Sequence, residues 1–357
     1  MKYKSTKTNI VIISLLLLFF IASCAKHTTE EVKKDYIIKI VARDDHPLSI
    51  DLSQNPYKEL ILLLNSEAQP NEIKKYLHLN DSQYDLLLND LYSQGLVKRN
   101  NEGKFFPSFM VINDENAEKL SKMSEEIGFF VAEIIKSKIA QIKNEYEKIE
   151  SLRYVPFDSL SFFILSDVAL NKWQITNIEV EFFKSPPPKR GNEFYYLSMQ
   201  RSNNNSEIEP FGNYYDYAKS LPLFTLHVYT NKRRLRNSIF YNSTKDLENI
   251  TYSLKFSDYK LNDLYIPVIN QDDLTKLKNI ADIVSKDLLA LLENNRNLLL
   301  ENYLNSTYKN CCSFREYILW LYQFIIRDAT NKLIAENIIL LPKNDFQQYI
   351  IMNKPID

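Results

Sequence analysis

The sequence predicts a mixed α+β protein, and three observations point to this class. Apolar residues recur at helical spacing between residues 56 and 152, alternate as in strands between residues 178 and 256, and return to a leucine-rich helical pattern between residues 272 and 336. With 357 residues, 45% of them hydrophobic, the chain can bury more than one core. We therefore expect an N-terminal domain, a connecting helix and a C-terminal α+β domain.

The N-terminus has the pattern of an export signal. Three lysines precede an apolar run from residue 10 to residue 22 that is too short to span a membrane comfortably. The run closes on Ile21-Ala22-Ser23-Cys24, which resembles the lipobox of bacterial lipoproteins. In that family the cysteine is acylated on sulfur, becomes the new N-terminus and anchors the protein to a membrane. The resemblance implies that residues 1–23 are removed, that Cys24 carries the lipid, and that residues 24–35 form a polar tether.

The same resemblance implies a location and partners. An exported, lipid-anchored chain belongs to the cell envelope, and we expect the outer membrane rather than the inner one. Loss of residues 1–23 removes three lysines and no acid, so the formal charge changes from 44 minus 45 to 41 minus 45, which is −4. A chain of this charge does not attract polyanions as a whole. The expected partners are therefore the membrane, through the lipid, and a protein or glycan, but not nucleic acid.

Residues 56–112 show the pattern of three short helices followed by a hairpin. The third helix has a capping start at Asn80-Asp81-Ser82 and stops at Gly95. The strand Leu96-Val97-Lys98-Arg99, the turn Asn100-Asn101-Glu102-Gly103 and the strand Lys104-Phe105-Phe106 follow it. This passage resembles the recognition helix and wing of winged helix-turn-helix domains. The resemblance implies a winged-helix-like domain over residues 36–113, with helices at 56–66, 70–77 and 81–93.

The charges in this segment argue against DNA binding. The presumed recognition helix carries Asp81, Asp85 and Asp90 and no lysine or arginine, whereas contacts to phosphates need cations. Residues 56–112 contain six lysines and arginines against seven acidic residues, so a basic footprint is missing. We therefore interpret the segment as a scaffold or a protein-contact module. A winged-helix DNA-binding regulator with a misread N-terminus is an alternative.

The rest of the chain predicts a connecting helix and an α+β domain over residues 153–357. The connecting helix is expected over residues 114–152, which carry an amphipathic stripe. A buried helix or strand-helix should follow at 159–173. Strands are expected at 178–183, 193–200, 223–230, 238–242 and 252–256, helices at 272–305 and 313–336, and an extended end at 338–342.

Asp167 is the candidate for a catalytic group. Its neighbours from Ser161 to Leu170 are mostly apolar, so its carboxylate must find a partner. We interpret it as a structural hydrogen-bond acceptor. An envelope hydrolase that uses Asp167 and an acid from the loop 207–216 is the alternative. We place Glu179 and Glu181 on the wet face of a strand, where they form no catalytic pair.

Two polar segments supply candidate ligand-binding residues. The loop around residue 212 concentrates acids and aromatic side chains, among them Tyr214, Tyr215 and Tyr217, a combination that suits sugar or peptide capture. The densest basic run contains Arg233 and Arg234 and can contact anionic groups. A tyrosine cluster over a core and a solvated hairpin tip are the structural alternatives.

Cysteines and histidines do not indicate a metal or redox site. Cys311 and Cys312 are adjacent, which disfavours a disulfide between them, and we expect both to be buried as small hydrophobic residues. The four histidines have no metal-ligand spacing, and no nucleotide-binding or hydrolase motif is present. The sequence therefore predicts no cofactor and no enzymatic activity. It favours a lipid-anchored binding or scaffold module for another envelope protein or a glycan.

Overall fold

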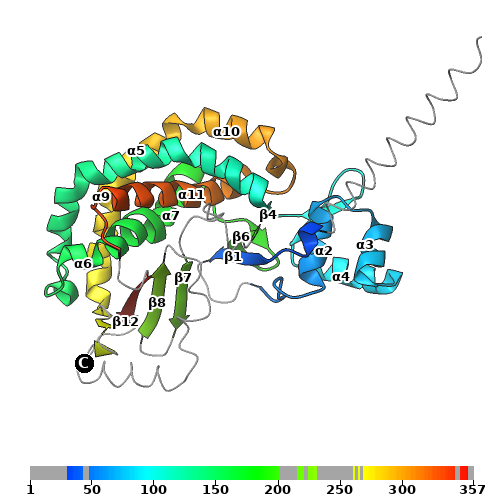
Figure 1. Cartoon of the computed structure of the whole chain (residues 1–357), viewed down its shortest axis with the longest axis horizontal. Helices are drawn as coiled ribbons and strands as arrows, with labels where there is room; N and C mark the ends of the chain where they lie inside the picture. The colour runs from blue at the N-terminus through cyan, green and yellow to red at the C-terminus, as the bar shows by residue number, and fades with distance from the viewer. Residues whose placement is uncertain are drawn as a thin grey trace, which may run out of the picture. The chain divides into compact units, whose positions relative to one another are not determined.

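The computed structural model describes residues 30–42, 48–201, 215–220, 224–230, 260–261, 264–265, 268–341 and 346–352 (Figure 1). These residues form a mixed α+β protein with small, mainly antiparallel sheets, as the sequence predicts. The chain divides into two compact units. Within the described residues, unit 1 comprises 30–113, 187–201 and 307–313, and unit 2 comprises 114–186, 215–306 and 314–352.

Unit 1 contains the three predicted helices and the hairpin. The helices are α2 (Tyr57–Asn65), α3 (Pro70–Leu77) and α4 (Asp81–Ser93), and the hairpin pairs β2 (Val97–Arg99) with β3 (Phe105–Pro107). Local capping explains where the helices begin. At the start of α4, the side-chain oxygen of Asn80 accepts a hydrogen bond from the backbone amide of Gln83, and the side-chain oxygen of Gln83 accepts one from the backbone amide of Asn80.

The sheet of unit 1 joins segments that are distant in sequence. Strand β6 (Glu193–Arg201) lies between β1 (Tyr36–Ala42), to which it is antiparallel, and β4 (Met110–Ile112), to which it is parallel. The short strand β5 (Lys189–Arg190) also pairs with β6. The 3-10 helix η5 (Thr307–Asn310) is attached through the hydroxyl of Tyr308, which donates to the carbonyl of Val111 at 3.2 Å.

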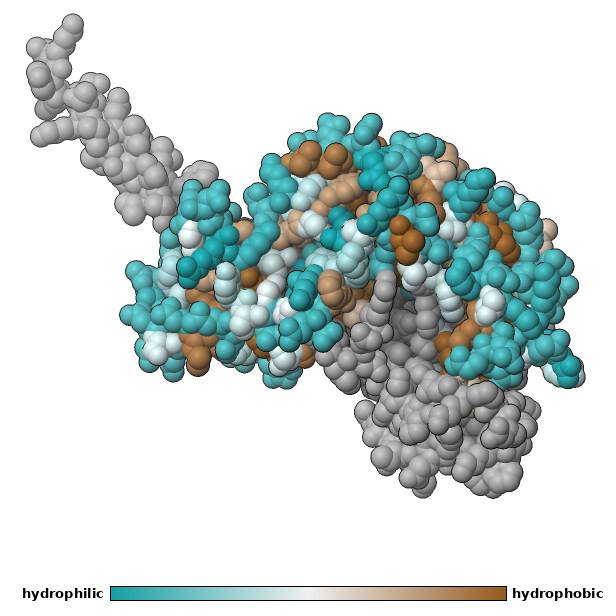
Figure 2. Space-filling model, turned by 180° about the vertical axis from the view of Figure 1, so that it is seen from behind, coloured by the Kyte–Doolittle hydropathy of each residue, from teal (hydrophilic) through white to brown (hydrophobic). Residues whose placement is uncertain are grey.

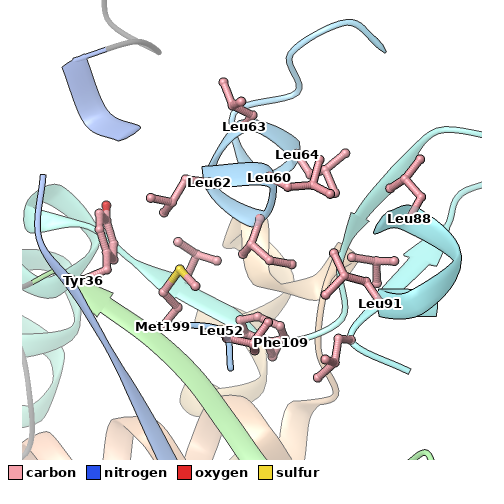
Figure 3. Packing of buried hydrophobic residues seen from close by; sticks show 14 of the residues in the cluster. Tyr36, Leu52, Leu60, Leu62, Leu63, Leu64, Leu88, Leu91, Phe109 and Met199 are labelled. Atoms are coloured by element: carbon pink, nitrogen blue, oxygen red, sulfur yellow. The ribbon is translucent and has the colours of Figure 1, made fainter. Parts of the chain in front are cut away.

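The core of unit 1 is built around α2 (Figure 3). Leu60 and Leu62 of this helix share one cluster of buried side chains with Met199 on the sheet and Leu91 of α4. Val32 belongs to the same cluster and is only 2% exposed. The last residues of the predicted tether are therefore part of the fold, and the described structure begins at Glu30.

Unit 2 is dominated by three long helices. Helix α5 (Asp114–Tyr146) contacts α9 (Gln271–Asn294) and α11 (Phe314–Ala335), as Figure 1 shows, and α10 (Arg296–Asn305) contacts α9 and α11. Five shorter helical elements complete the described helical part of unit 2: η1 (Glu150–Leu152), α6 (Phe157–Phe162), α7 (Trp173–Asn177) and two π-helices, η2 (Phe163–Lys172) and η3 (Ile178–Phe183). The predicted buried helix at 159–173 is thus confirmed as a helix, most of it in the rare π form.

One strand prediction in this unit is wrong. Residues 178–183 are helical, and Ile178 and Phe182 are buried one turn apart while Val180 between them is exposed. The residue types in this segment alternate as in a strand. Apolar residues two positions apart also occur on a helix, so this alternation does not distinguish the two. The extended end expected at 338–342 forms no strand in its described residues, 338–341: a turn at Glu336 and Asn337, where Asn337 has a positive φ of 57°, leads into a bend at Ile338 and Ile339. The strand follows later, as β12 (Phe346–Met352).

The main sheet of unit 2 has the order β11-β12-β8-β7. Its strands are β7 (Tyr215–Ser220), β8 (Phe224–Thr230), β11 (Val268–Ile269) and β12, and a separate pair consists of β9 (Lys260–Leu261) and β10 (Leu264–Tyr265). The strands predicted at 193–200 and 223–230 are confirmed as β6 and β8. Those predicted at 238–242 and 252–256 lie outside the described residues.

The visible surface of the described residues is mainly hydrophilic, with scattered hydrophobic side chains (Figure 2). Among the helices that the structure describes, none combines the length and the apolar composition needed to cross a bilayer.

Candidate functional site

Helix α4 and the hairpin of unit 1 present a surface that combines aromatic, aliphatic and cationic side chains and extends over both faces of the hairpin, because Arg99 and Phe105 lie on one face and Lys98 and Phe106 on the other. We call it the α4–hairpin surface. It consists of Asp85, Leu86, Asn89 and Tyr92 of α4 and of Lys98, Arg99, Lys104, Phe105 and Phe106 of the hairpin.

Contacts between aromatic rings join the helix to the hairpin. The rings of Tyr92 and Phe105 meet edge to face, with centroids 5.9 Å apart. The guanidinium of Arg99, which is directly opposite Phe105 in the hairpin, lies 4.4 Å from the centre of the Phe105 ring. The ammonium of Lys98 lies 5.2 Å from the ring of Phe106 in the same way. Two of the three cations of this surface thus lie over aromatic rings, and the third, Lys104, lies 3.7 Å from the carboxylate of Glu102.

The turn that connects the strands is ordered by its own sequence. The side-chain oxygen of Asn100 accepts hydrogen bonds from the amides of Glu102, at 3.0 Å, and Lys104, at 2.9 Å. Gly103 has a φ of 81°, which a residue with a side chain adopts only with strain. The hairpin therefore presents its exposed tip, residues 100–104, in a defined conformation.

The acidic residues of α4 are largely engaged in contacts within unit 1. Asp81 accepts a hydrogen bond from the ammonium of Lys74 at 2.6 Å. Asp90 accepts one from the hydroxyl of Tyr57 at 2.9 Å, and burial together with this carboxylate raises the pKa of Tyr57. Asp85 is exposed on the outer side of the helix. Leu86 and Tyr92, which are 62% and 54% exposed, flank Asn89 on the same side.

Asp167 occupies a different setting, inside the π-helix η2 of unit 2. Its side chain has no exposed surface. One carboxylate oxygen accepts a hydrogen bond from the hydroxyl of Tyr349 at 2.8 Å, and the other accepts one from the amide of Asn171 at 3.3 Å. This arrangement supports the interpretation of Asp167 as a structural acceptor. Glu179, expected on the wet face of a strand, is buried in η3, whereas Glu181 is exposed.

The candidate ligand residues from the two polar segments are only partly described. Cys24, Tyr214, Arg233 and Arg234, and most of the loop 207–216, lie outside the described residues. Tyr215 and Tyr217 lie in β7, where they pair with Thr230 and Val228 of β8. Tyr215 and Thr230 therefore lie at the same end of the β7–β8 pair.

The two cysteines are free thiols, Cys312 buried and Cys311 half-buried, and both sulfurs lie near the carbonyl of Tyr308, at 3.6 and 3.4 Å. No group of three or more metal-ligating side chains occurs within the described residues. No protein-family model, no curated protein and no solved structure matches the chain.

Sequence reasoning missed the α4–hairpin surface as a site, although it named most of the residues in it. Phe105 and Phe106 follow the predicted turn directly, but the contact of Phe105 with Tyr92 depends on how the hairpin folds back on α4. A signal was available, because a tight hairpin turn at residues 100–103 places Arg99 opposite Phe105 and Lys98 opposite Phe106, and each of these pairs shares one face of the hairpin.

Proposed function

We propose that the chain is a lipoprotein of the cell envelope, anchored through acyl chains on Cys24, that binds another envelope protein through its α4–hairpin surface. The observation that carries this proposal is the exposure of Leu86 and Tyr92 on a helix without cations. Exposed aromatic and aliphatic side chains that are rimmed by polar residues are typical of protein-binding surfaces. A glycan that stacks on the tyrosines at 214, 215 and 217 is a second possible ligand.

The order of elements in unit 1 supports a winged-helix-like domain that serves protein contact. Three helices precede a two-stranded hairpin, as in winged helix-turn-helix proteins. In a DNA-binding member of this class, the third helix supplies cations and polar side chains to the major groove. Helix α4 carries Asp85, Leu86 and Tyr92 at the exposed positions instead, so we propose a scaffold role for this domain and no nucleic-acid partner.

The burial of Asp167 favours binding over hydrolysis. A catalytic carboxylate must reach its substrate, whereas Asp167 has no exposed surface and both of its oxygens already accept hydrogen bonds. We therefore propose that the protein is not an enzyme.

Two experiments test the proposal. Intact mass and fatty-acid labelling should reveal acyl chains on the wild-type protein and none on Cys24→Ser, and an unlabelled wild-type protein that washes off membranes would exclude the lipoprotein. For the partner, a photoreactive amino acid at position 86 or 92 should crosslink one envelope protein of defined mass in cells. The same probe at Asn297, exposed on α10 of unit 2, is the matched control and should not capture that protein.

A further inference from the structure

We propose that the hairpin of unit 1 rests on an anionic membrane surface and binds lipid headgroups through Lys98, Arg99 and Lys104. This inference rests on the proposed lipid anchor at Cys24, and it adds a second contact with the membrane. It assigns to the hairpin a ligand class, the negatively charged phospholipid headgroup.

The first argument is the short distance between the anchor and the fold. Val32 is buried in the core of unit 1, and Glu31 accepts a hydrogen bond from the hydroxyl of Tyr36 and forms an ion pair with Lys34 at 2.7 Å. Only residues 25–29 separate Cys24 from the first described residue. Six consecutive Cα spacings reach at most about 20 Å. The segment between the lipid and the fold is therefore short, and the lipid holds unit 1 itself close to the bilayer.

The second argument is that this reach matches the size of the unit. A globular body of about 100 residues has a radius of gyration of about 13 Å. An anchor of about 20 Å lets such a body turn different sides towards the membrane while it stays in contact with it. Because the anchor makes the contact between the hairpin and the headgroups intramolecular, even a weak attraction between them populates the bound state of the hairpin.

The third argument is the chemistry of the hairpin. Residues 97–106 contain three cationic residues, Lys98, Arg99 and Lys104, and a single acidic one, Glu102. Phe105 and Phe106 lie beneath two of these cations and are half-buried. Cations that attract phosphates, next to aromatic rings that tolerate the interface, are the combination used at membrane surfaces. Helix α4, with the exposed Asp85, lacks this combination, so we assign the lipid contact to the hairpin and not to the whole surface.

The test is hydrogen exchange on the lipidated full-length protein in vesicles of phosphatidylcholine, with and without phosphatidylglycerol. Amides of residues 98–104 should exchange at least about fivefold more slowly on the anionic vesicles, because one cation near such a surface contributes about that factor. The triple variant Lys98→Gln, Arg99→Gln, Lys104→Gln should lose this difference. A matched triple variant at three other exposed lysines, Lys75→Gln, Lys286→Gln, Lys309→Gln, should keep it.

A second variant guards against disruption of the hairpin. Asn101→Glu places a negative charge at the exposed tip without removing any cation over an aromatic ring, and it should also reduce the protection of these amides from exchange.

Flotation of the protein with vesicles distinguishes the lipid anchor from the hairpin contact. Protein that does not float with vesicles contradicts the anchor itself. Protein that floats but exchanges equally on both lipids overturns the hairpin contact and leaves the anchor intact. Protection that occurs only in native envelope membranes indicates a protein partner and also overturns the lipid contact.

Discussion

Gly128 of α5 lies against Asp328 of α11 without room for a side chain between them. A Cβ atom on Gly128 would be 2.7 Å from the Cβ of Asp328, and 3.1 Å from the carbonyl oxygen of Ile325. The hydroxyl of Ser124, one turn earlier on α5, donates a hydrogen bond to the carboxylate of Asp328. The close approach of the two helices in unit 2 therefore depends on the absence of a side chain at position 128.

Gly128→Ala should destabilise the protein. Overpacking of a tight helix contact costs about 1 to 3 kcal/mol, and the better helix propensity of alanine returns about 1 kcal/mol of this. We expect a lower midpoint in thermal or urea unfolding. Ser137→Ala, on the exposed side of the same helix, should change the stability by less than about 0.5 kcal/mol. Equal stability of the two variants would show that α5 and α11 can separate without cost.

Asp167 and Tyr349 should be coupled energetically. Asp167→Asn keeps an acceptor for the Tyr349 hydroxyl, whereas Asp167→Leu removes that acceptor from the core, at a cost of about 1 to 3 kcal/mol. Thermal melts should rank wild type and the Asn variant above the Leu variant. A double-mutant cycle with Tyr349→Phe should reveal an interaction free energy above about 0.5 kcal/mol. If Asn and Leu both melt like wild type yet lose a ligand, Asp167 belongs to a binding or catalytic site.

Asp273 should make stability depend on pH in the acid range. Burial by itself raises the pKa of this carboxyl, but hydrogen bonds from Lys276 and Ser151 outweigh it and hold the pKa below its ordinary value of 3.8. Because the folded-state pKa is the lower one, the stabilisation is complete above the unfolded pKa and is lost as the pH falls through the folded one. Wild type should therefore lose its stability advantage over Asp273→Asn between about pH 5 and pH 2.

The neighbouring residue provides the control for this titration. Asp272 is exposed, so Asp272→Asn should leave the pH dependence of unfolding unchanged. Urea unfolding at a series of pH values measures both variants. An advantage of wild type over Asp273→Asn that stays constant down to pH 2 would contradict the role of the bonds from Lys276 and Ser151.

DNA binding should be weak and nonspecific. The cations of the hairpin can touch phosphates, but α4 offers only Asp85 and uncharged side chains to a groove. Gel shifts of the detergent-solubilised protein should show no complex below about 1 μM at physiological salt, since nonspecific affinities lie at about 1 to 100 μM. Submicromolar binding that weakens steeply with salt would restore the DNA-binding regulator as the better interpretation.

Local signals explain most of what the sequence predicted correctly. The start of α4 follows from Asn80 and Gln83, and the hairpin turn from Asn100 and Gly103, because these contacts span only a few residues. The sheet of unit 1 could not be predicted in this way. Tyr36 pairs with Arg201, and no local pattern connects strands so far apart. The π-helix at 178–183 was missed because its alternating residue types also fit a strand.

The same limit applies to the candidate site. Apolar neighbours predicted that Asp167 is buried and needs a donor, but Tyr349 lies 182 residues away. The charges of α4 were evident from the sequence, whereas the pairing of Asp90 with Tyr57 required the packing of α2 against α4. The contact of Tyr92 with Phe105 likewise depends on tertiary structure.

Because unit 1 consists of three separate stretches of chain, its sheet can form only after the later stretches have been made. A chain is synthesised from its N-terminus, and the proposed export would follow the same direction, so residues 30–113 come first. Their strands β1 and β4 have no partner until β6 emerges, and the Tyr308 contact to Val111 forms only after residue 308 has followed. A chain that ends at residue 113 therefore lacks β6, the strand that pairs with both β1 and β4.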